Sequence, residues 1–331
     1  MSQRSRVLDL RPGMAIPGGR VVIRGEGFST SGRSLPEVRF GDAPGRVVFA
    51  STRELAVVVP SGVSGRGVPV TVSRAEGDTL RLDIAGSFAT GLHQVDSPIF
   101  DREGNLYVTY SGTRGQQVPV SIFRVTPLGA RETFSSGIVN PTSLALDAAG
   151  RLHVSSRFEG TVYRLDADGS VEPFATELGV ACGLAFAGDG RLFVGDRSGT
   201  IFAVSPEGRA SQFATLPSSV AAFHLVFGAR QQLYVTGPTL SAYDAVYEID
   251  QTGTVKVRSQ GFGRPQGLAM SPTGELFVAE ALAGASGLYR VSERPDPELV
   301  LAGEGLVGAA IDADGTLVVC SNDTAFRLPP A

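Results

Sequence analysis

The stretch Gly190-Arg191-Leu192-Phe193-Val194 decides the fold, because its pattern recurs through most of this chain of 331 residues. The repeat consists of a small or polar residue, any residue, leucine, any residue and valine. Its six leucines are Leu106, Leu152, Leu192, Leu233, Leu276 and Leu317, which stand 46, 40, 41, 43 and 41 residues apart. A period of about 40–45 residues built from short strands is typical of a β-propeller with one blade per repeat. We therefore predict an all-β chain with a six-bladed β-propeller over residues 86–331.

Each repeat predicts four strands. An apolar innermost strand, such as 142–147, leads through a tight Asp/Gly turn into the Leu-x-Val strand. A third strand carries one aromatic residue and a fourth, more polar strand lies outside. The aromatic residues are Phe123, Tyr163, Phe202, Tyr247, Tyr289 and Phe326. Because they recur once per blade, we expect them to form the core between blades.

Residues 1–85 predict a second module, an immunoglobulin-like β-sandwich. Short alternating runs separated by Gly, Pro and Ser turns lie at 20–24, 37–40, 46–49, 54–59 and 68–72. This spacing is typical of a sandwich. Residues 17–28 resemble the opening of an IPT/TIG domain, and 38–41 and 59–62 resemble two of its turns. The resemblance implies a spacer or a contact surface rather than chemistry.

Residues 86–92 are predicted to close the propeller. Their Ser87-Phe88-Ala89-Thr90 resembles the predicted fourth strands at 172–177 and 212–216, whereas the last repeat has no fourth strand of its own. We expect this segment to complete the last blade as an N-terminal closing strand, which removes an open sheet edge. We also expect a fixed junction between the modules.

Residues 94–331 resemble NHL-repeat propellers and the senescence marker protein/gluconolactonase superfamily, most clearly at 265–280. The chain has no tryptophan and no recurring Gly-Gly doublet, so WD and kelch propellers fit less well. The resemblance implies a site at the strand openings, where metal-dependent lactonases carry Glu, Asn and Asp. The matching positions here are Asp96, Thr142, Cys182 and Gln266. One carboxylate makes a weak Ca²⁺ or Zn²⁺ site, so we predict no cofactor, with Asp96 as the only candidate metal ligand.

Composition excludes several partners. A formal net charge of −4 gives no electrostatic case for nucleic acid, and no apolar run is long enough for membrane insertion. The basic N-terminus lacks a following apolar stretch, so we expect a cytoplasmic protein as the chain stands, or a secreted or periplasmic one if a signal peptide has been removed. Cys182 and Cys320 are expected to be reduced thiols in a monomer.

The topology predicts which side chains share one mouth of the channel. The residue that opens each innermost strand and the loop after each second strand lie at the same end, where propellers usually bind ligands. The candidate ligand-binding residues are Asp96, Thr142, Arg157, Cys182, Asp196, Arg197, Arg264 and Gln266. The arginines suit a bidentate contact with a carboxylate, although pairing with Asp196, Glu159 or Glu280 is the alternative.

His224 is the only histidine predicted to lie in the channel. It is a candidate general base if a carboxylate orients it. Asp244 and Tyr243 are its expected neighbours, and Glu280 is a further candidate acid or base. The alternatives are a histidine that bonds a backbone carbonyl in a filled channel and a Glu280 at a solvated strand end.

Three functions remain open at this point. The first is a binding protein for a small polar or carboxylate-bearing ligand at the channel mouth. The second is a metal-independent lactone or ester hydrolase or lyase, with His224 as base and Arg197 or Tyr243 stabilising the oxyanion. The third is a scaffold that binds a protein partner.

Overall fold

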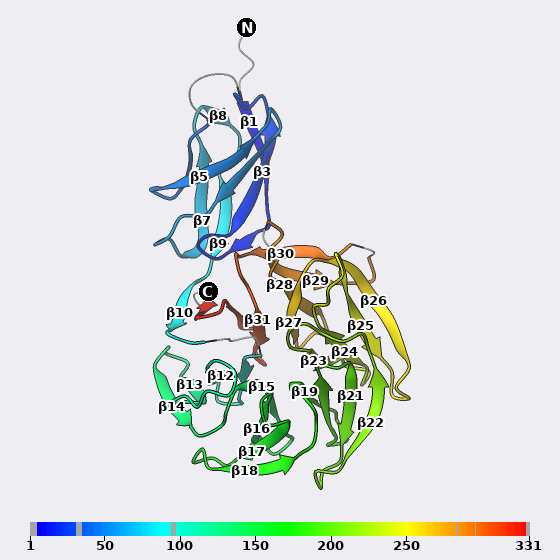
Figure 1. Ribbon diagram of the computed structural model, residues 1–331. Helices are drawn as coiled ribbons and strands as arrows, with labels where there is room; N and C mark the ends of the chain where they lie inside the picture. Colours follow the sequence, from blue (N-terminus) through cyan, green and yellow to red (C-terminus); the bar gives the residue numbers. More distant parts are fainter. Residues whose placement is uncertain (1–4, 31–34, 94–96, 283, 295, 329–331) are drawn as a thin grey trace.

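The computed structural model describes residues 5–30, 35–93, 97–282, 284–294 and 296–328. Every regular element in these ranges is a β-strand, and a sandwich-like N-terminal module stands on a propeller-like ring of sheets (Figure 1). None of the described segments forms a helix long and apolar enough to cross a membrane. The predicted all-β fold class is confirmed.

The N-terminal module has two layers that share β5. One layer has the order β2-β9-β7-β4-β5 and the other β5-β6-β3-β1-β8. In β3, Val21 and Ile23 point into the core while Arg20, Val22 and Arg24 point outward, as period-2 alternation requires. The strands are β1 (Ser5–Arg11), β2 (Met14–Ala15), β3 (Arg20–Glu26), β4 (Val38–Phe40), β5 (Ala43–Ala50), β6 (Glu54–Val58), β7 (Gly65–Val72), β8 (Ala75–Glu76) and β9 (Leu80–Ile84).

The ring consists of groups of four antiparallel strands, which we call units. Unit one comprises β11 (Ile99–Phe100), β12 (Leu106–Thr109), β13 (Ile122–Val125) and β14 (Arg131–Ser135). Unit two comprises β15 (Pro141–Leu146), β16 (Leu152–Ser156), β17 (Thr161–Leu165) and β18 (Val171–Ala175). Unit three comprises β19 (Ala181–Phe186), β20 (Leu192–Asp196), β21 (Thr200–Val204) and β22 (Ala210–Thr215).

The remaining units follow the same order of strands. Unit four comprises β23 (His224–Phe227), β24 (Leu233–Thr236), β25 (Asp244–Ile249) and β26 (Val255–Phe262). Unit five comprises β27 (Pro265–Met270), β28 (Leu276–Glu280), β29 (Gly287–Val291) and β30 (Glu298–Ala302). Unit six comprises β31 (Gly308–Ile311), β32 (Leu317–Cys320), β33 (Thr324–Arg327) and β10 (Gly86–Thr90).

One register recurs in every unit. The valine of the repeat lies opposite the aromatic residue of the third strand, as in the pairs Val108 with Phe123 and Val194 with Phe202. The aromatic ring of Phe123 packs in a core that also contains Ala310 and Val318 of unit six. The predicted role of these residues between neighbouring units is therefore confirmed for this ring.

The ring closes in two ways. The first strands contact one another in the cyclic order β11, β15, β19, β23, β27, β31 and back to β11. In addition, β10 pairs antiparallel with β33, so the segment that follows the N-terminal module supplies the outer strand of unit six. All the innermost strands therefore surround one central axis.

The junction between the modules is more extensive than the sequence predicts. The two-residue strand β2 pairs in parallel with β9 on one side and with β30 on the other. Unit five consequently belongs to a thirteen-stranded sheet that continues into the N-terminal module, while the other units form five separate four-stranded sheets. The closing strand is thus not the only connection between the modules, and the sequence did not indicate β2 because so short a pairing leaves no periodic pattern.

Candidate functional site

A cavity of about 350 Å³ runs along the central axis. The first strands of all the units line it, and most of the lining side chains are apolar. Small side chains such as Ala145, Ala185, Ala269 and Ala310 keep it open. The polar side chains in its lining are those of Ser97, Ser143 and His224. Among the side chains that line the channel, these three therefore supply the hydrogen-bonding groups.

His224 opens β23 and is buried, with 2% of its surface exposed. Its Nδ1 lies 3.4 Å from Oγ of Ser97, which precedes β11. Because two first strands separate β11 from β23 on either side of the ring, this contact spans the channel. The register places Ser143, Gly183 and Gly267 at the equivalent positions of β15, β19 and β27. His224 is thus a large side chain where neighbouring strands carry small ones.

Two predicted site carboxylates hold loops at the mouth. Asp196 ends β20, and its Oδ1 accepts a 2.7 Å hydrogen bond from the backbone N–H of Val180, just before β19. Ser198 Oγ donates to the other carboxylate oxygen. The turn is tight, because a side chain on Gly179 would meet this carboxylate at 2.7 Å. Asp196 therefore fixes the loop that leads into the first strand of its own unit.

Glu280 performs the same task in unit five. It ends β28 and is 2% exposed. Its carboxylate accepts hydrogen bonds of 2.8 Å from the backbone N–H groups of Gly263 and Arg264 and of 2.7 Å from Leu282. Burial raises the pKa of Glu280, and these N–H groups act in the opposite direction. The alternative of a solvated strand end does not hold for Glu280.

Asn140 is a mouth residue that sequence reasoning missed. It is fully buried, and its Nδ2 donates to the carbonyl oxygens of Gly112 and Thr113, both at 2.9 Å. Its Oδ1 accepts from the N–H of Gly115 at 2.7 Å, so it fixes the loop after β12 in the neighbouring unit. Its φ of 47° lies in the left-handed region, which asparagine tolerates. The Asn-Pro pair before β15 was the available signal.

Asp244 and Tyr243 do not form a set with His224 through any described contact. The Asp244 carboxylate accepts from Thr239, both from its backbone N–H at 3.1 Å and from its hydroxyl at 2.6 Å. It therefore fixes the loop between β24 and β25. Tyr243 is 73% exposed and Leu240 is 93% exposed, so this loop presents both side chains to solvent.

The three candidate arginines lie on mouth loops of units two, three and five. Arg157 Nη2 is 3.5 Å from Oγ of Ser111. Arg197 and Arg264 are exposed, and within the described residues their side chains form no ion pair or hydrogen bond. The carboxylates expected to pair with them, Asp196 and Glu280, bind backbone N–H groups instead. The mouth therefore carries two guanidinium groups available to an anion.

The strand-opening residues are buried between units. Thr142 donates to the carbonyl of Asn140 at 3.1 Å, and the Cys182 thiol donates to that of Val180 at 3.2 Å. The carbonyl of Gln266 accepts from the Thr236 hydroxyl of unit four at 2.6 Å. The side chains of Thr142 and Cys182 are thus already engaged with the backbone, and a thiol is not the oxygen ligand that a hard cation prefers.

Asp96, the candidate metal ligand, lies outside the described residues, and within them no cluster of three or more His, Cys, Asp and Glu residues suits a metal ion. Both cysteines are buried and free.

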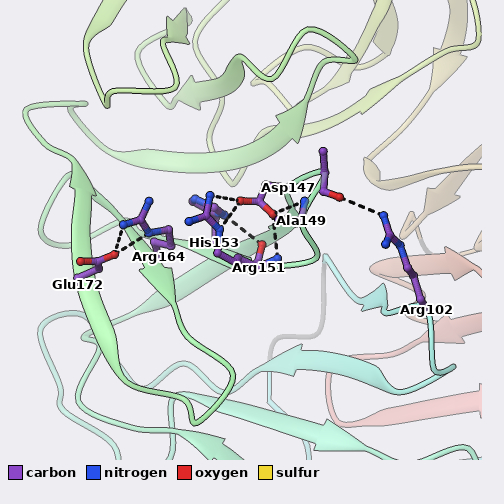
Figure 2. A network of polar contacts seen from close by, with 8 residues as sticks. Arg102, Asp147, Ala149, Arg151, His153, Arg164 and Glu172 are labelled. Carbon is purple, nitrogen blue, oxygen red and sulfur yellow. Dashed lines mark hydrogen bonds and ion pairs between the residues drawn. The ribbon is translucent and has the colours of Figure 1, made fainter.

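The opposite face carries a polar network around His153 in β16 (Figure 2). Arg151 pairs with Asp147 at 2.8 Å, and Arg102 donates to the carbonyl of Ala148 at 3.0 Å. The His153 ring packs edge-on against Phe174 and Phe186, with centroids 5.0 and 4.8 Å away. Burial lowers the pKa of His153 to about 4, so it is neutral at pH 7 and belongs to the core.

Comparison with known proteins agrees with this architecture. Residues 8–85 match the model of the IPT/TIG domain, so the N-terminal module is of that type. An auxiliary nutrient binding protein from Bacteroides thetaiotaomicron VPI-5482 superposes with a TM-score of 0.59 at 12% identity, covering 98% of this chain and 97% of that one. No curated protein matches the chain in sequence.

Two further solved structures share the fold. A candidate gluconolactonase has a TM-score of 0.59 at 16% identity and covers 74% of this chain and 91% of its own. A streptogramin B lyase has a TM-score of 0.53 at 12% identity and covers 99% and 93%. At such identities these similarities establish the fold, which is a propeller-like ring with gluconolactonase-like neighbours.

Proposed function

We propose that the chain is a binding protein whose channel mouth takes a small polar or carboxylate-bearing ligand. In this proposal the six units are the blades of an NHL-like and gluconolactonase-like propeller over residues 86–331, preceded by the IPT/TIG module over 1–85. The name of the nutrient-binding neighbour, which spans both modules, is consistent with binding rather than turnover.

The observation that carries the proposal is the unpaired state of Arg197 and Arg264. A guanidinium recognises a carboxylate through two parallel hydrogen bonds, which gives both affinity and orientation. The carboxylates expected to pair with these arginines, Asp196 and Glu280, direct their oxygens into the protein. The guanidinium N–H groups of Arg197 and Arg264 would therefore be available to form hydrogen bonds with an anionic ligand.

A second candidate function is a metal-independent lactone or ester hydrolase or lyase, and His224 favours it. A buried imidazole in contact with Ser97 across the channel is a candidate general base. Arg197 is the better candidate for stabilising an oxyanion, because Tyr243 points into solvent. The gluconolactonase and lyase names among the structural neighbours suit this alternative.

The third candidate, a protein-interaction scaffold, has support in the exposed apolar side chains of the mouth loops. Phe158 is 53% exposed, Leu282 44% and Val220 37%, in addition to Leu240 and Tyr243. Exposed apolar residues near arginines are typical of protein contact surfaces. We rank this below ligand binding, because the exposed residues belong to separate loops.

The test is calorimetric titration of the full chain with gluconate, malate and glucuronate, and with their neutral amides. The variants are Arg197→Gln and Arg264→Gln, with Arg230→Gln on an opposite-face turn as the matched control. We expect at least one acid to bind and each mouth variant to weaken it about 10- to 100-fold, because charge-assisted hydrogen bonds contribute roughly 1.5–3 kcal/mol.

Equal binding of acids and amides, or an equal loss in Arg230→Gln, would contradict the proposal. The same panel extended to lactones and esters distinguishes a binding protein from a hydrolase or lyase. Turnover that His224→Ala abolishes while binding persists would favour the hydrolase or lyase.

A further inference from the structure

A cavity of about 1,000 Å³ lies in the corner between the N-terminal module and unit five. Figure 1 shows the corner, with β3 rising above β28, β29 and β30. The cavity is formed by both modules. It is separate from the channel and from the mouth arginines, so a function there does not depend on the proposed function.

We call this cavity the groove. One of its walls is the edge of strand β30. Glu298, Leu299 and Val300 are consecutive residues of β30, and all three line the groove. Side chains of consecutive strand residues point to opposite faces of a sheet, so three in a row line a cavity only where the edge of the strand faces it. The edge continues into the pairing of β30 with β2, which occupies Leu301 and Ala302. At these two residues the sheet of unit five is already extended by one strand from the N-terminal module, β2.

The edge of β30 carries one charge, on Glu298, followed by an apolar run. Outer strands of sheets commonly carry charges or proline, which discourage pairing with another chain. The outer strands of units one to four follow this rule or are polar, whereas β10 of unit six has neither a charge nor a proline. They carry Arg131 and Glu132 in β14, Glu172 and Pro173 in β18, Ser211 and Gln212 in β22, and Lys256 and Arg258 in β26. The sequence of β30, Glu-Leu-Val-Leu-Ala, is apolar after its first residue.

The opposite wall of the groove is formed by side chains of the N-terminal module. Arg20, Val22 and Arg24 alternate along β3 and line the groove together with Val48 of β5 and Val58 of β6. Arg20 donates to the carbonyl of Gly284 and so joins this wall to the loop before β29. A strand laid on the β30 edge would therefore place alternate side chains against valines.

The charges of the groove balance. Its ionisable residues are Arg11, Arg20, Arg24, Glu54, Glu298 and Glu304, besides Tyr289. Arg11 pairs with Asp9 at 3.0 Å, Glu298 pairs with Arg290 at 2.7 Å, and Glu54 lies opposite Arg24 in the sheet. Recognition in the groove would rest on the main chain and on apolar contacts rather than on the sign of charge.

We propose that this groove binds an extended segment of a partner polypeptide, which adds to β30 as a further strand beside β2. The main chain of the segment pairs with the open edge at 298–300, and its alternate side chains pack on Val22 and Val58. Strand addition of this kind takes affinity from the backbone and selectivity from the side-chain wall.

The experiment uses two fluorescent, end-capped heptapeptides with the full-length chain. One alternates Thr and Val and the other alternates Glu and Val. Each has a twin N-methylated at alternate residues, which keeps the side chains and removes the N–H donors. We expect both parents to bind with affinities within about threefold, and the twins to bind at least tenfold more weakly. Amide exchange should slow at least tenfold at the residue within 298–300 whose N–H faces the open edge, with no change in β22.

Two variants locate the site. Val22→Lys fills the side-chain wall without touching β30 and should weaken both peptides about tenfold, whereas Ser211→Lys on the β22 edge should not. Equal binding of the N-methylated twins, protection on another outer strand, or no binding of either peptide at millimolar concentration would overturn the proposal. So would a dimer of this chain that Val22→Lys dissociates, because the groove would then belong to a second copy.

Discussion

Two turns of this molecule have the same sequence and different surroundings. Asp166-Ala167-Asp168-Gly169 joins β17 to β18, and Asp312-Ala313-Asp314-Gly315 joins β31 to β32. In both turns the glycine N–H donates to the carbonyl of the first aspartate, at 2.9 and 3.0 Å, and the glycine φ is 82° and 86°. The local sequence therefore determines the turn completely.

The surroundings of the two glycines differ because the two turns occupy different places in the repeat. The first turn joins the third and fourth strands of unit two at the outside of the ring, and the second joins the first and second strands of unit six near the central axis. A Cβ on Gly169 would lie 2.0 Å from the carbonyl oxygen of Phe134 in unit one, whereas a Cβ on Gly315 would meet nothing within 4 Å. The carbonyl of Gly169 also accepts a 2.8 Å hydrogen bond from Ser135. The turn between a third and a fourth strand can thus contact the neighbouring unit, and we call this contact the seam. The place of a turn within the repeat determines whether it forms such a contact.

The largest expected effect comes from adding a methyl group to each glycine. Gly169→Ala should lower the free energy of unfolding by about 4 kcal/mol, from the left-handed backbone and from displacement of the seam with unit one. Gly315→Ala should cost about 1–2 kcal/mol, because only the backbone contributes. Unfolding in guanidinium chloride measures both losses of stability. Equal losses would show that the contact with unit one adjusts to the added methyl group at no cost in free energy.

A smaller effect is expected from protonating His153, whose ring packs on the seam between units two and three. Its pKa of about 4 in the folded protein lies below the value of about 6.5 for an unfolded chain. Stability should therefore fall as pH decreases from 6.5 towards 4, by about 2 kcal/mol at pH 5. His153→Phe should flatten that part of the stability curve, and an unchanged slope would assign the pH dependence to other groups.

The smallest effect should come from the hydrogen bond that only the outer turn receives. Ser135 is buried, and Ser135→Ala removes its bond to the Gly169 carbonyl, which should cost about 1 kcal/mol. In a Gly169→Ala background the loss should shrink, since the seam is already displaced. Full additivity of the two losses would indicate that the methyl group is accommodated without moving the turn.

This comparison shows why sequence predicted the fold better than the site. The Leu-x-Val repeat, the third-strand aromatics and the Asp/Gly turns are local patterns, and each appears where expected. The Asp-Ala-Asp-Gly sequence does not reveal the contact of Gly169 with unit one, because nothing local distinguishes this glycine from Gly315. The two-residue strand β2 was missed for the same reason.

The mouth residues depend on contacts between segments far apart in sequence. Asp196 and Val180 are 16 residues apart, and Asn140 reaches Gly112 across 28. The sequence placed Asp196 and Glu280 at the correct strand ends. It could not indicate that their carboxylates turn inward, because that depends on backbone N–H groups contributed by another loop.

The pairing of β10 with β33 has a consequence for biosynthesis. The closing strand at 86–90 is synthesised long before its partner at 324–327. At roughly 5–20 residues per second, the intervening segment takes on the order of 10–50 s to synthesise. During that time the IPT/TIG module can fold beside an unpaired strand. Ring closure therefore has to wait until residues 324–327 have been synthesised, and until then β10 has no partner in the ring.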